Sequence, residues 1–248
     1  MSVEVTQPFT YFIADLHLTE NRPDITACFL SFLENDAPAA QALYILGDLF
    51  EYWIGDDDDS TFLRDITEGL RRLSEKNVSI FFIHGNRDFL LGQQYAKQCG
   101  MTLLPEVEVI TLYDQPIIVM HGDTLCTLDT DYQAFRRKSR TWWWQGIIKS
   151  LPLFIRRKIA KNYREKSAMA TNEKPQEIMD VTPEEVVQCF KAHNARILIH
   201  GHTHRPAVHD LVVDEYAAQR IVLGDWYEQG SILKVQPGKM ELINKQFG

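Results

Sequence analysis

The sequence lacks several features that define common protein classes. No apolar run approaches the roughly 20 residues that a membrane-spanning helix needs. The opening "MSVEVTQPFTYF" has neither the basic start nor the apolar stretch of a signal peptide. The four cysteines show no CxxC spacing, so we expect reduced thiols of a cytoplasmic protein, without a disulfide frame or a zinc knuckle. A net charge of −8 argues against nucleic-acid binding, and nothing indicates an obligate protein partner.

What the sequence does contain is the pattern of one α/β domain over residues 1–248. The chain is 45% apolar, which suffices for a sizeable core. Near-continuous apolar runs alternate with helical patterns, as in central sheets that are covered by helices. The expected strands are 11–14, 42–46, 79–83, 116–120 and 196–199, followed by shorter ones in "AVHDLVV", "RIVLG" and "SILKV". The expected helices are 25–35, 62–76, 89–98 and 183–193, the last with Thr182 and Glu185 as a capping box.

Residues 131–179 interrupt this alternation, and we interpret them as an inserted helical lid. From Tyr132 to Arg164 there are ten Lys or Arg and no Asp or Glu, which leaves 16 of the 26 basic residues for the rest of the chain. The segment also holds "WWW" and "SLPLFI". Such a surface suits an anionic, partly apolar ligand or an anionic lipid surface, with 156–158 as its docking face. The alternative is a solvated basic helix that packs through its tryptophans.

Polar residues follow each of the five buried strands. The motifs are "DLH", "GD", "HGNRD", "HGD" and "HGHTH", and four of the eight histidines fall within "LIHGHTHRPAVH". In α/β sheets, ligands bind outside the carboxyl ends of the strands, so these residues are expected to converge. The candidate metal ligands are Asp15, His17, Asp48, Asn86, His121, His202 and His204.

One such motif alone has a structural explanation, because a lone Asp after a strand is usually a turn residue and a lone His is usually a hydrogen-bonded core residue. Five motifs of metal-ligand type favour a metal centre instead. The donors are imidazole, carboxylate and amide oxygen without thiolate, which argues against structural zinc or an iron–sulfur cluster. Seven donors suit two ions that share a bridge. Asp48 is the best bridge, because its carboxylate has two oxygens.

The motifs "DLH", "GD", "GNRD", "HGD" and "GHTH", in this order, make the sequence resemble the calcineurin-like metallophosphoesterase superfamily. The resemblance implies a sandwich of two mixed β-sheets flanked by helices, here with an inserted helical cap. It also implies two metal ions that share one ligand. The implied sets are Asp15, His17, Asp48 and His204 for one ion, and Asp48, Asn86, His121 and His202 for the other. Histidines outside this pattern are expected to be structural or solvated: His84, His193, His200 and His209.

Arg87 departs from the superfamily, most of whose members have His in "GNHD" or "GNHE". That His is usually assigned to protonating the leaving oxygen, which Arg cannot do because its pKa stays above roughly 12. The leaving group must then need no proton, and a phosphate fits because its second pKa is about 6. Arg87 would bind phosphate oxygens bidentately. We therefore predict a pyrophosphate substrate, with Arg87 and Asp48 as catalytic residues.

With "GNRD" and the insert together, the sequence resembles the UDP-2,3-diacylglucosamine pyrophosphatases of lipid A biosynthesis, in "FIADLHL", "LYILGDLFE", "FIHGNRDFLLG" and "MHGDTLC". The resemblance implies hydrolysis of UDP-2,3-diacylglucosamine at the α-phosphorus, giving UMP and 2,3-diacylglucosamine 1-phosphate. It implies two Mn²⁺ per chain and a peripheral position on the cytoplasmic side of the inner membrane. The implied substrate contacts are Asn86, Arg87, Asp129, Ser167, Thr171, Lys174 and His202.

Two other functions remain open on the sequence alone. One is a phosphodiesterase of the same fold that acts on another nucleotide, against which Arg87 and the basic, aromatic insert argue. The other is a scaffold that has lost its metals, against which the seven filled ligand positions argue. The acidic run 56–59 lacks EF-hand spacing and is interpreted as a solvated turn before a helix.

Overall fold

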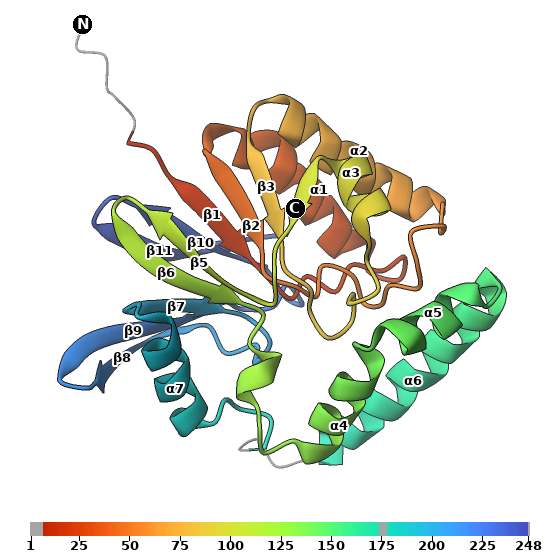
Figure 1. The fold of residues 1–248 in the computed structure, drawn as a ribbon. Coiled ribbons are helices and arrows are strands. Elements are labelled where there is room, and N and C mark those ends of the chain that lie inside the picture. Colours follow the sequence, from red (N-terminus) through yellow and green to blue (C-terminus); the bar gives the residue numbers. More distant parts are fainter. Residues whose placement is uncertain (1–6, 174–177, 248) are drawn as a thin grey trace, which may run out of the picture.

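The computed structural model describes residues 7–173 and 178–247, leaving aside the side chains at 166 and 168–173. Two β-sheets pack face to face, and helices lie on their outer faces (Figure 1). This confirms the expected sandwich of two mixed sheets flanked by helices. Among the described residues, no helix is both long and apolar enough to cross a membrane.

The first sheet has the strand order β11-β10-β1-β2-β3-β4. Strands β1 to β4 run parallel to one another, while the hairpin of β10 and β11 pairs antiparallel with β1 at one side. The strands are β1 (Thr10–Ile13), β2 (Ala42–Ile45), β3 (Ser79–Phe82), β4 (Met101–Leu103), β10 (Gly230–Gln236) and β11 (Lys239–Lys245).

The second sheet has the order β5-β6-β7-β9-β8. Its central strands β6, β7 and β9 are parallel, and β5 and β8 pair antiparallel at the edges. The strands are β5 (Val107–Leu112), β6 (Gln115–Met120), β7 (Ile197–His200), β8 (Ala207–Val213) and β9 (Tyr216–Val222).

Helices cover the outer faces of both sheets. Helices α1 to α3 pack on the first sheet, and α7 packs on the second. The helices of the described residues are α1 (Pro23–Asn35), α2 (Thr61–Glu75), α3 (Gln93–Cys99), α4 (Thr130–Ser139), α5 (Trp142–Ser150), α6 (Leu153–Glu173) and α7 (Pro183–His193), with short 3-10 turns η1 (Ala37–Ala39) and η2 (Asp123–Leu125).

The apolar strands are buried on both faces, because successive side chains of a strand point to opposite sides. In β1, Tyr11 and Ile13 pack beneath the helices of the first sheet, whereas Phe12 lies between the two sheets. In β6, Val119 lies between the sheets, while Ile118 packs towards α7. This double burial explains the near-continuous apolar runs.

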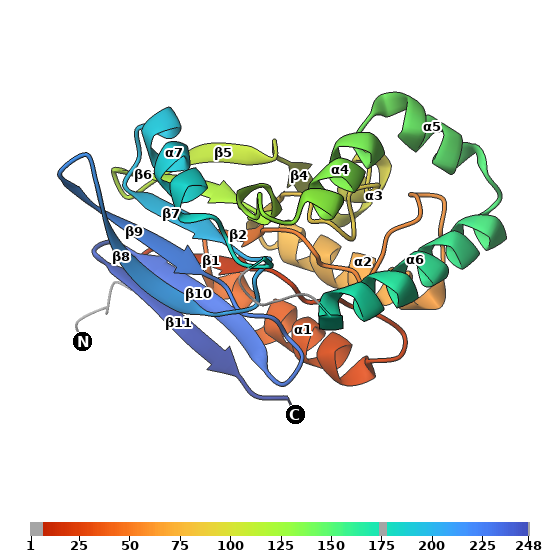
Figure 2. The same cartoon turned by 90° about the horizontal axis from the view of Figure 1, so that it is seen from below.

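Helices α4, α5 and α6 follow one another without an intervening strand and project beside the sandwich (Figure 2). We call them the helical insert. They occupy the greater part of the segment that the sequence sets apart at 131–179, although α4 begins one residue earlier. Residues 174–177 lie outside the described part.

The helix expected at 89–98 is shorter than its pattern, because α3 begins only at Gln93. The cause is Asp56, whose carboxylate accepts hydrogen bonds from the backbone N–H groups of Gly92 and Tyr95 and so caps the helix from a distant loop. The capping box expected at α7 is also wrong. The hydroxyl of Thr182 contacts Thr127 Oγ1 at 2.8 Å and makes no cap hydrogen bond.

Candidate metal centre

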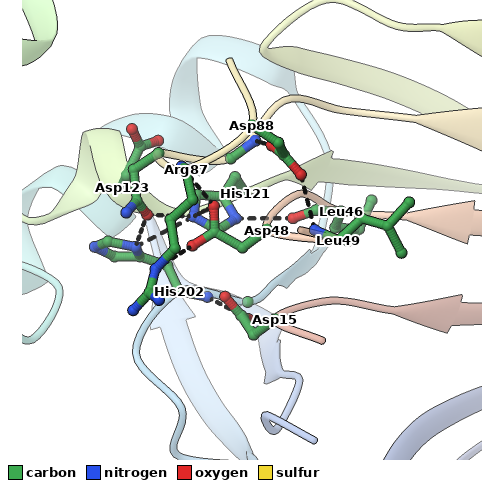
Figure 3. Close-up of polar contacts among 12 residues, drawn as sticks. Asp15, Leu46, Asp48, Leu49, Arg87, Asp88, His121, Asp123 and His202 are labelled. Atoms are coloured by element: carbon green, nitrogen blue, oxygen red, sulfur yellow. Dashed lines mark hydrogen bonds and ion pairs between the residues drawn. The ribbon is translucent and has the colours of Figure 1, made fainter. Parts of the chain in front are cut away.

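Polar residues from the carboxyl ends of five strands meet at one place (Figure 3). Asp15 follows β1, Asp48 follows β2, and Arg87 lies in the loop after β3. From the second sheet, His121 follows β6 and His202 follows β7. Hydrogen bonds join these loops, as from the backbone N–H of His202 to the carboxylate oxygen Asp15 Oδ2 at 2.8 Å. The convergence expected from the strand ends is therefore present.

Asp15, His17 and His204 form the first group of donors. His17 Nε2 lies 3.1 Å from His204 Nε2, and Asp15 Oδ1 lies 3.5 Å from the same His204 nitrogen. Each residue can place one ligand atom within 4.8 Å of the others. Asp15 and His17 are buried, whereas His204 is half-buried.

Asn86, His121 and His202 form the second group. Asn86 Oδ1 lies 2.9 Å from His121 Nε2 and 3.0 Å from His202 Nδ1, and the two imidazole nitrogens are 3.2 Å apart. Asp15, Asp48 and His121 can also place their ligand atoms within 4.8 Å of one another. The second group thus contains the donors that the resemblance implies for a second ion.

Asp48 lies between the two groups. Its Oδ1 is 3.9 Å from His121 Nε2 in the second group, and its Oδ2 is 3.9 Å from His17 Nδ1 in the first. One carboxylate oxygen therefore faces each group, which is the geometry that a bridging ligand requires. Asp48 is also buried, at 1% exposure.

The side chains fit divalent cations. Asp15 Oδ1 and His17 Nδ1 are buried atoms without a hydrogen-bond partner among the described residues. Buried polar atoms are rarely left in this state, because an unpaired group costs roughly 1–3 kcal/mol. A mixed set of imidazole, carboxylate and amide donors suits divalent metal ions. That these seven residues ligate metal stays a prediction, but their arrangement suits it.

Burial sets the protonation of the imidazoles. It lowers the pKa of His202 to about 3, and it holds the pKa of His17 well below its ordinary value. For His121 burial also opposes protonation, but Asp48 and Asp15 outweigh it and raise the pKa. A metal ion takes neutral imidazole, so His17 and His202 are already in the form that binds.

The backbone at the site is strained. Five of the seven candidate ligands have positive φ angles, in the left-handed region that L side chains rarely adopt. Each such residue costs roughly 1–3 kcal/mol, and strain of this kind concentrates at functional sites. The angles are 56° at Asp15, 51° at His17, 52° at Asp48, 71° at His202 and 55° at His204.

Two glycines of the motifs allow the close approach of these loops. A Cβ atom at Gly85 would overlap Asp48 Oδ1, and one at Gly201 would overlap Asp15 Oδ2. Any larger residue would therefore displace a candidate metal ligand. This accounts for glycine in "HGNRD" and "HGHTH".

Hydrogen bonds from outside the donor groups orient the site. His121 Nδ1 lies 2.8 Å from Leu46 O, a carbonyl that can only accept, so Nε2 is left free to face the donors. Asp88, the last residue of "HGNRD", joins two loops of the site. Its carboxylate accepts from Leu49 N at 2.8 Å and from Gly85 N at 2.9 Å, which fixes the loops after β2 and β3.

Arg87 lies at the edge of the donor groups. Its backbone N–H donates to Asp48 Oδ1 at 2.9 Å, and its Nε is 3.5 Å from Asp48 Oδ2. Its Nη1 pairs with Glu51, a residue that the sequence patterns did not single out. The Arg87 side chain is 15% exposed, so a small open face remains for a ligand.

The helical insert reaches the site through α4. Tyr132 donates its hydroxyl hydrogen bond to buried Asp123, the last residue of "HGD", and Arg136 Nε donates to the same carboxylate at 2.7 Å. The Tyr132 ring centre lies 6.1 Å from that of His202. Burial opposes ionisation of Asp123, but His121 and Arg136 lower its pKa, so it is an anion. The sequence motifs did not predict that Asp123 contacts the insert.

Two of the four predicted substrate contacts in or next to the insert, Asp129 and Ser167, have side chains that the structure describes. Asp129 caps α4, because its side chain accepts from Tyr132 N at 3.2 Å. Ser167 is half-buried in α6. Thr171 lies in α6 with a side chain outside the described set, and Lys174 lies outside the described residues. Their contacts with substrate remain predictions.

The remaining histidines lie outside the donor groups. His200 is buried beside Arg220, at 3.2 Å from its Nη1, and burial lowers its pKa to about 4. His84 contacts Leu91 O at 2.7 Å. His193 contacts the Cys189 carbonyl of its own helix. His209 is half-buried on β8, and none of the four belongs to either donor group.

The acidic run 56–59 contains the expected turn before α2, with Asp57 and Asp59 exposed, but two of its carboxylates pair with the insert. Asp57 pairs with Arg156 of α6, and Asp58 Oδ1 pairs with Arg157 Nη2 at 2.8 Å. Arg156 is buried, at 4% exposure. Buried Arg156 thus helps to hold the insert on the core and is not free for docking, which corrects the expectation for this residue, whereas Arg157 and Lys158 are exposed.

The chain belongs to the calcineurin-like phosphoesterase family, which matches residues 10–206. Its structure is also similar to that of vacuolar protein sorting 29 from Cryptosporidium parvum, with a TM-score of 0.50 and 14% identity over 98% of each chain. At this identity the similarity concerns the fold alone.

Similarity to curated relatives places the chain in a smaller family within the calcineurin-like phosphoesterases. The chain is 52% identical to the UDP-2,3-diacylglucosamine hydrolase of Aeromonas hydrophila over 94% of this chain and 97% of the relative. It is 51% identical to the UDP-2,3-diacylglucosamine hydrolase of Escherichia coli O81, over 96% of this chain and 99% of the relative. Within the calcineurin-like phosphoesterases, the chain is thus a member of the UDP-2,3-diacylglucosamine hydrolase family.

Proposed function

We propose that this protein hydrolyses the pyrophosphate bond of UDP-2,3-diacylglucosamine in lipid A biosynthesis, with UMP and 2,3-diacylglucosamine 1-phosphate as products. The observation that carries the proposal is the meeting of two donor groups at Asp48, with Arg87 beside them. About half of the residues are identical to those of hydrolases named for this substrate, in alignments that cover nearly the whole length of both chains.

The proposed cofactor is two Mn²⁺ ions per chain. Asp15, His17 and His204 would hold one, Asn86, His121 and His202 the other, and Asp48 both. When bound, the ions supply the positive charge that activates a water molecule and stabilises phosphoryl oxygens. The buried, unpartnered atoms Asp15 Oδ1 and His17 Nδ1 support this assignment.

Arg87 is proposed to bind oxygens of the pyrophosphate. Its guanidinium stays charged at every working pH, so it offsets negative charge and donates no proton to the leaving group. Water attack at the α-phosphorus then places the new oxygen in UMP and releases the lipid phosphate, which needs no proton to leave. The proposed substrate contacts are Asn86, Arg87, Asp129, Ser167, Thr171, Lys174 and His202.

The helical insert (131–179 in the sequence pattern) is proposed to be a lid that binds the acyl chains. Phe135 of α4 stacks on Tyr163 of α6, with ring centres 4.6 Å apart. Trp144 of α5 lies 6.2 Å from Phe135 and 6.0 Å from Phe89, which is two residues from Arg87. Aromatic contacts thus extend from the insert to the core close to Arg87. Each acyl methylene buried there would contribute about 0.8 kcal/mol.

The protein is proposed to act at the cytoplasmic side of the inner membrane, docked on anionic lipid through α5 and the start of α6. Trp142 is 86% exposed, Phe154 72% and Ile147 56%. Lys149 and Lys158 are exposed in the same stretch. Exposed apolar side chains beside lysines suit the interface of an anionic bilayer.

Incubation with UDP-2,3-diacylglucosamine and Mn²⁺, with UMP release followed over time, tests the function. We expect release that stops on chelation and returns when metal is restored. A panel of soluble nucleotides and cyclic nucleotides serves as the comparison. Faster hydrolysis of one of these would favour a phosphodiesterase of the same fold with another substrate and would refute the proposal.

A further inference from the structure

Glu51 lies where the first sheet, the candidate metal centre and the helical insert meet. It is three residues beyond Asp48, and its backbone N–H donates to Leu18 O at 3.1 Å. One carboxylate oxygen, Oε2, pairs with Arg87 Nη1. The other, Oε1, accepts from Arg164 Nε of α6 at 2.9 Å. A single carboxylate therefore joins an arginine of the core to an arginine of the insert.

The guanidinium of Arg87 lies between two carboxylates, those of Asp48 and Glu51, and Glu51 restrains its orientation. Its Nε lies 3.5 Å from Asp48 Oδ2 and has no hydrogen-bond partner among the described residues. A guanidinium drawn fully onto Asp48 would be turned towards a candidate metal ligand. Glu51 pairs with Nη1 of Arg87, so the guanidinium spans the carboxylates of Glu51 and Asp48. Such a restraint fixes a long side chain before the substrate binds.

The three side chains of this cluster carry a net positive charge, which favours binding of an anion. Two guanidinium groups share the carboxylate of Glu51, so the three side chains carry one surplus positive charge. All three are partly exposed, at 15% for Arg87, 26% for Glu51 and 19% for Arg164, so an anion can reach them. Because Arg164 belongs to α6, the same carboxylate ties the position of the insert to the orientation of Arg87.

We infer that Glu51 is a positioning residue for the hydrolysis. It holds Arg87 in the orientation that meets the pyrophosphate, and it links that orientation to the placement of α6 through Arg164. The inference rests on the proposed function of the centre, and it assigns Glu51 no proton transfer and no contact with the reacting atoms.

A double-mutant cycle on the whole protein tests this role. Glu51→Gln keeps the size of the side chain and removes the charge, and we expect kcat to fall on the order of 10- to 100-fold, as for loss of one charge-assisted contact. In the Arg87→Ala background the same change should cost only about 2-fold, because its effect passes through Arg87. Glu20→Gln, which removes an exposed carboxylate from the loop after β1, is the matched control and should have little effect.

Two further measurements separate positioning from other roles. Glu51 Oε2 lies 3.7 Å from His17 Nδ1, so the metal content of each variant is measured, and we expect Glu51→Gln to retain the wild-type amount. Arg164→Gln should raise KM more than it lowers kcat, since Arg87 keeps its partner. The inference would be overturned if Glu51→Gln and Arg87→Ala reduced kcat by independent factors that multiply in the double mutant. Loss of metal from the Glu51→Gln variant would also overturn it.

The cycle is also run with bis(p-nitrophenyl) phosphate, a soluble phosphodiester. If wild-type protein fails to release UMP from the lipid substrate, the proposed function is wrong. Coupling between Glu51 and Arg87 on the phosphodiester would still support the positioning role. Additive effects on both substrates would refute that role whatever the natural substrate is.

Discussion

Arg156 is the buried anchor of the helical insert, and we predict that Arg156→Met loosens the insert from the core. The side chain is 3% exposed. It donates to Ile54 O at 2.6 Å and to Leu151 O at 2.8 Å, and it pairs with both carboxylate oxygens of Asp57. Methionine has a similar length and apolar stem, but it has no N–H donor for any of these acceptors.

The expected magnitude follows from the burial of each partner. Each carbonyl left without a donor costs roughly 1–3 kcal/mol if it stays buried. The ion pair contributes less than a fully buried pair, because the Asp57 side chain is 58% exposed and water can replace Arg156. Methionine recovers part of the packing. We therefore expect Arg156→Met to weaken the attachment of the insert by about 2–4 kcal/mol, with the sheets intact.

Amide hydrogen exchange along α6 measures this loosening directly. Arg157→Met is the matched control, because Arg157 is 51% exposed and makes one ion pair, with Asp58, which should contribute less than about 1 kcal/mol. We expect faster exchange in α6 for Arg156→Met, little change for Arg157→Met, and unchanged protection in β1 and β2. Equal protection of α6 in both variants and the wild type would refute the reasoning.

Four further predictions concern the proposed chemistry and docking. Asp48→Ala should lower metal content, measured by elemental analysis, and reduce UMP release by orders of magnitude; full activity after exhaustive chelation would contradict the two-metal centre. Arg87→Ala should cost roughly 2.7–4 kcal/mol in activation free energy, and Arg87→Lys should recover only part, because Lys lacks the bidentate fork. In water labelled with ¹⁸O, label should enter UMP, and label in the lipid phosphate would show attack at the other phosphorus. Trp142→Ala with Phe154→Ala should weaken binding to anionic vesicles, and unchanged binding would exclude docking through these residues.

The strand ends and the candidate ligands could be predicted because both depend on local sequence. A run buried on both faces ends where a polar residue and a glycine follow, as at Gly47 and Asp48, and the five expected strands agree with the structure to within a residue or two. Strands β4, β5 and β11 were missed because most of their side chains are half-buried or exposed, so they show no continuous apolar run. The start of α3 was missed because Asp56, which caps it, lies 36 residues before Gly92.

The partners of the basic segment could not be predicted for a related reason. A run of acidic residues and a run of basic ones each resemble a solvated surface when taken alone, and nothing local records that Asp57 and Arg156 meet across 99 residues. In the structure, five of the ten basic residues between 132 and 164 pair with acidic groups of the core: Arg136, Arg140, Arg156, Arg157 and Arg164. Much of the positive charge thus attaches the insert to the core. Docking on lipid would then depend more on exposed Trp142 and Phe154 than on charge. Added salt would screen the exposed Lys149 and Lys158 more than the buried pair of Arg156, so it would weaken docking before it loosens the insert.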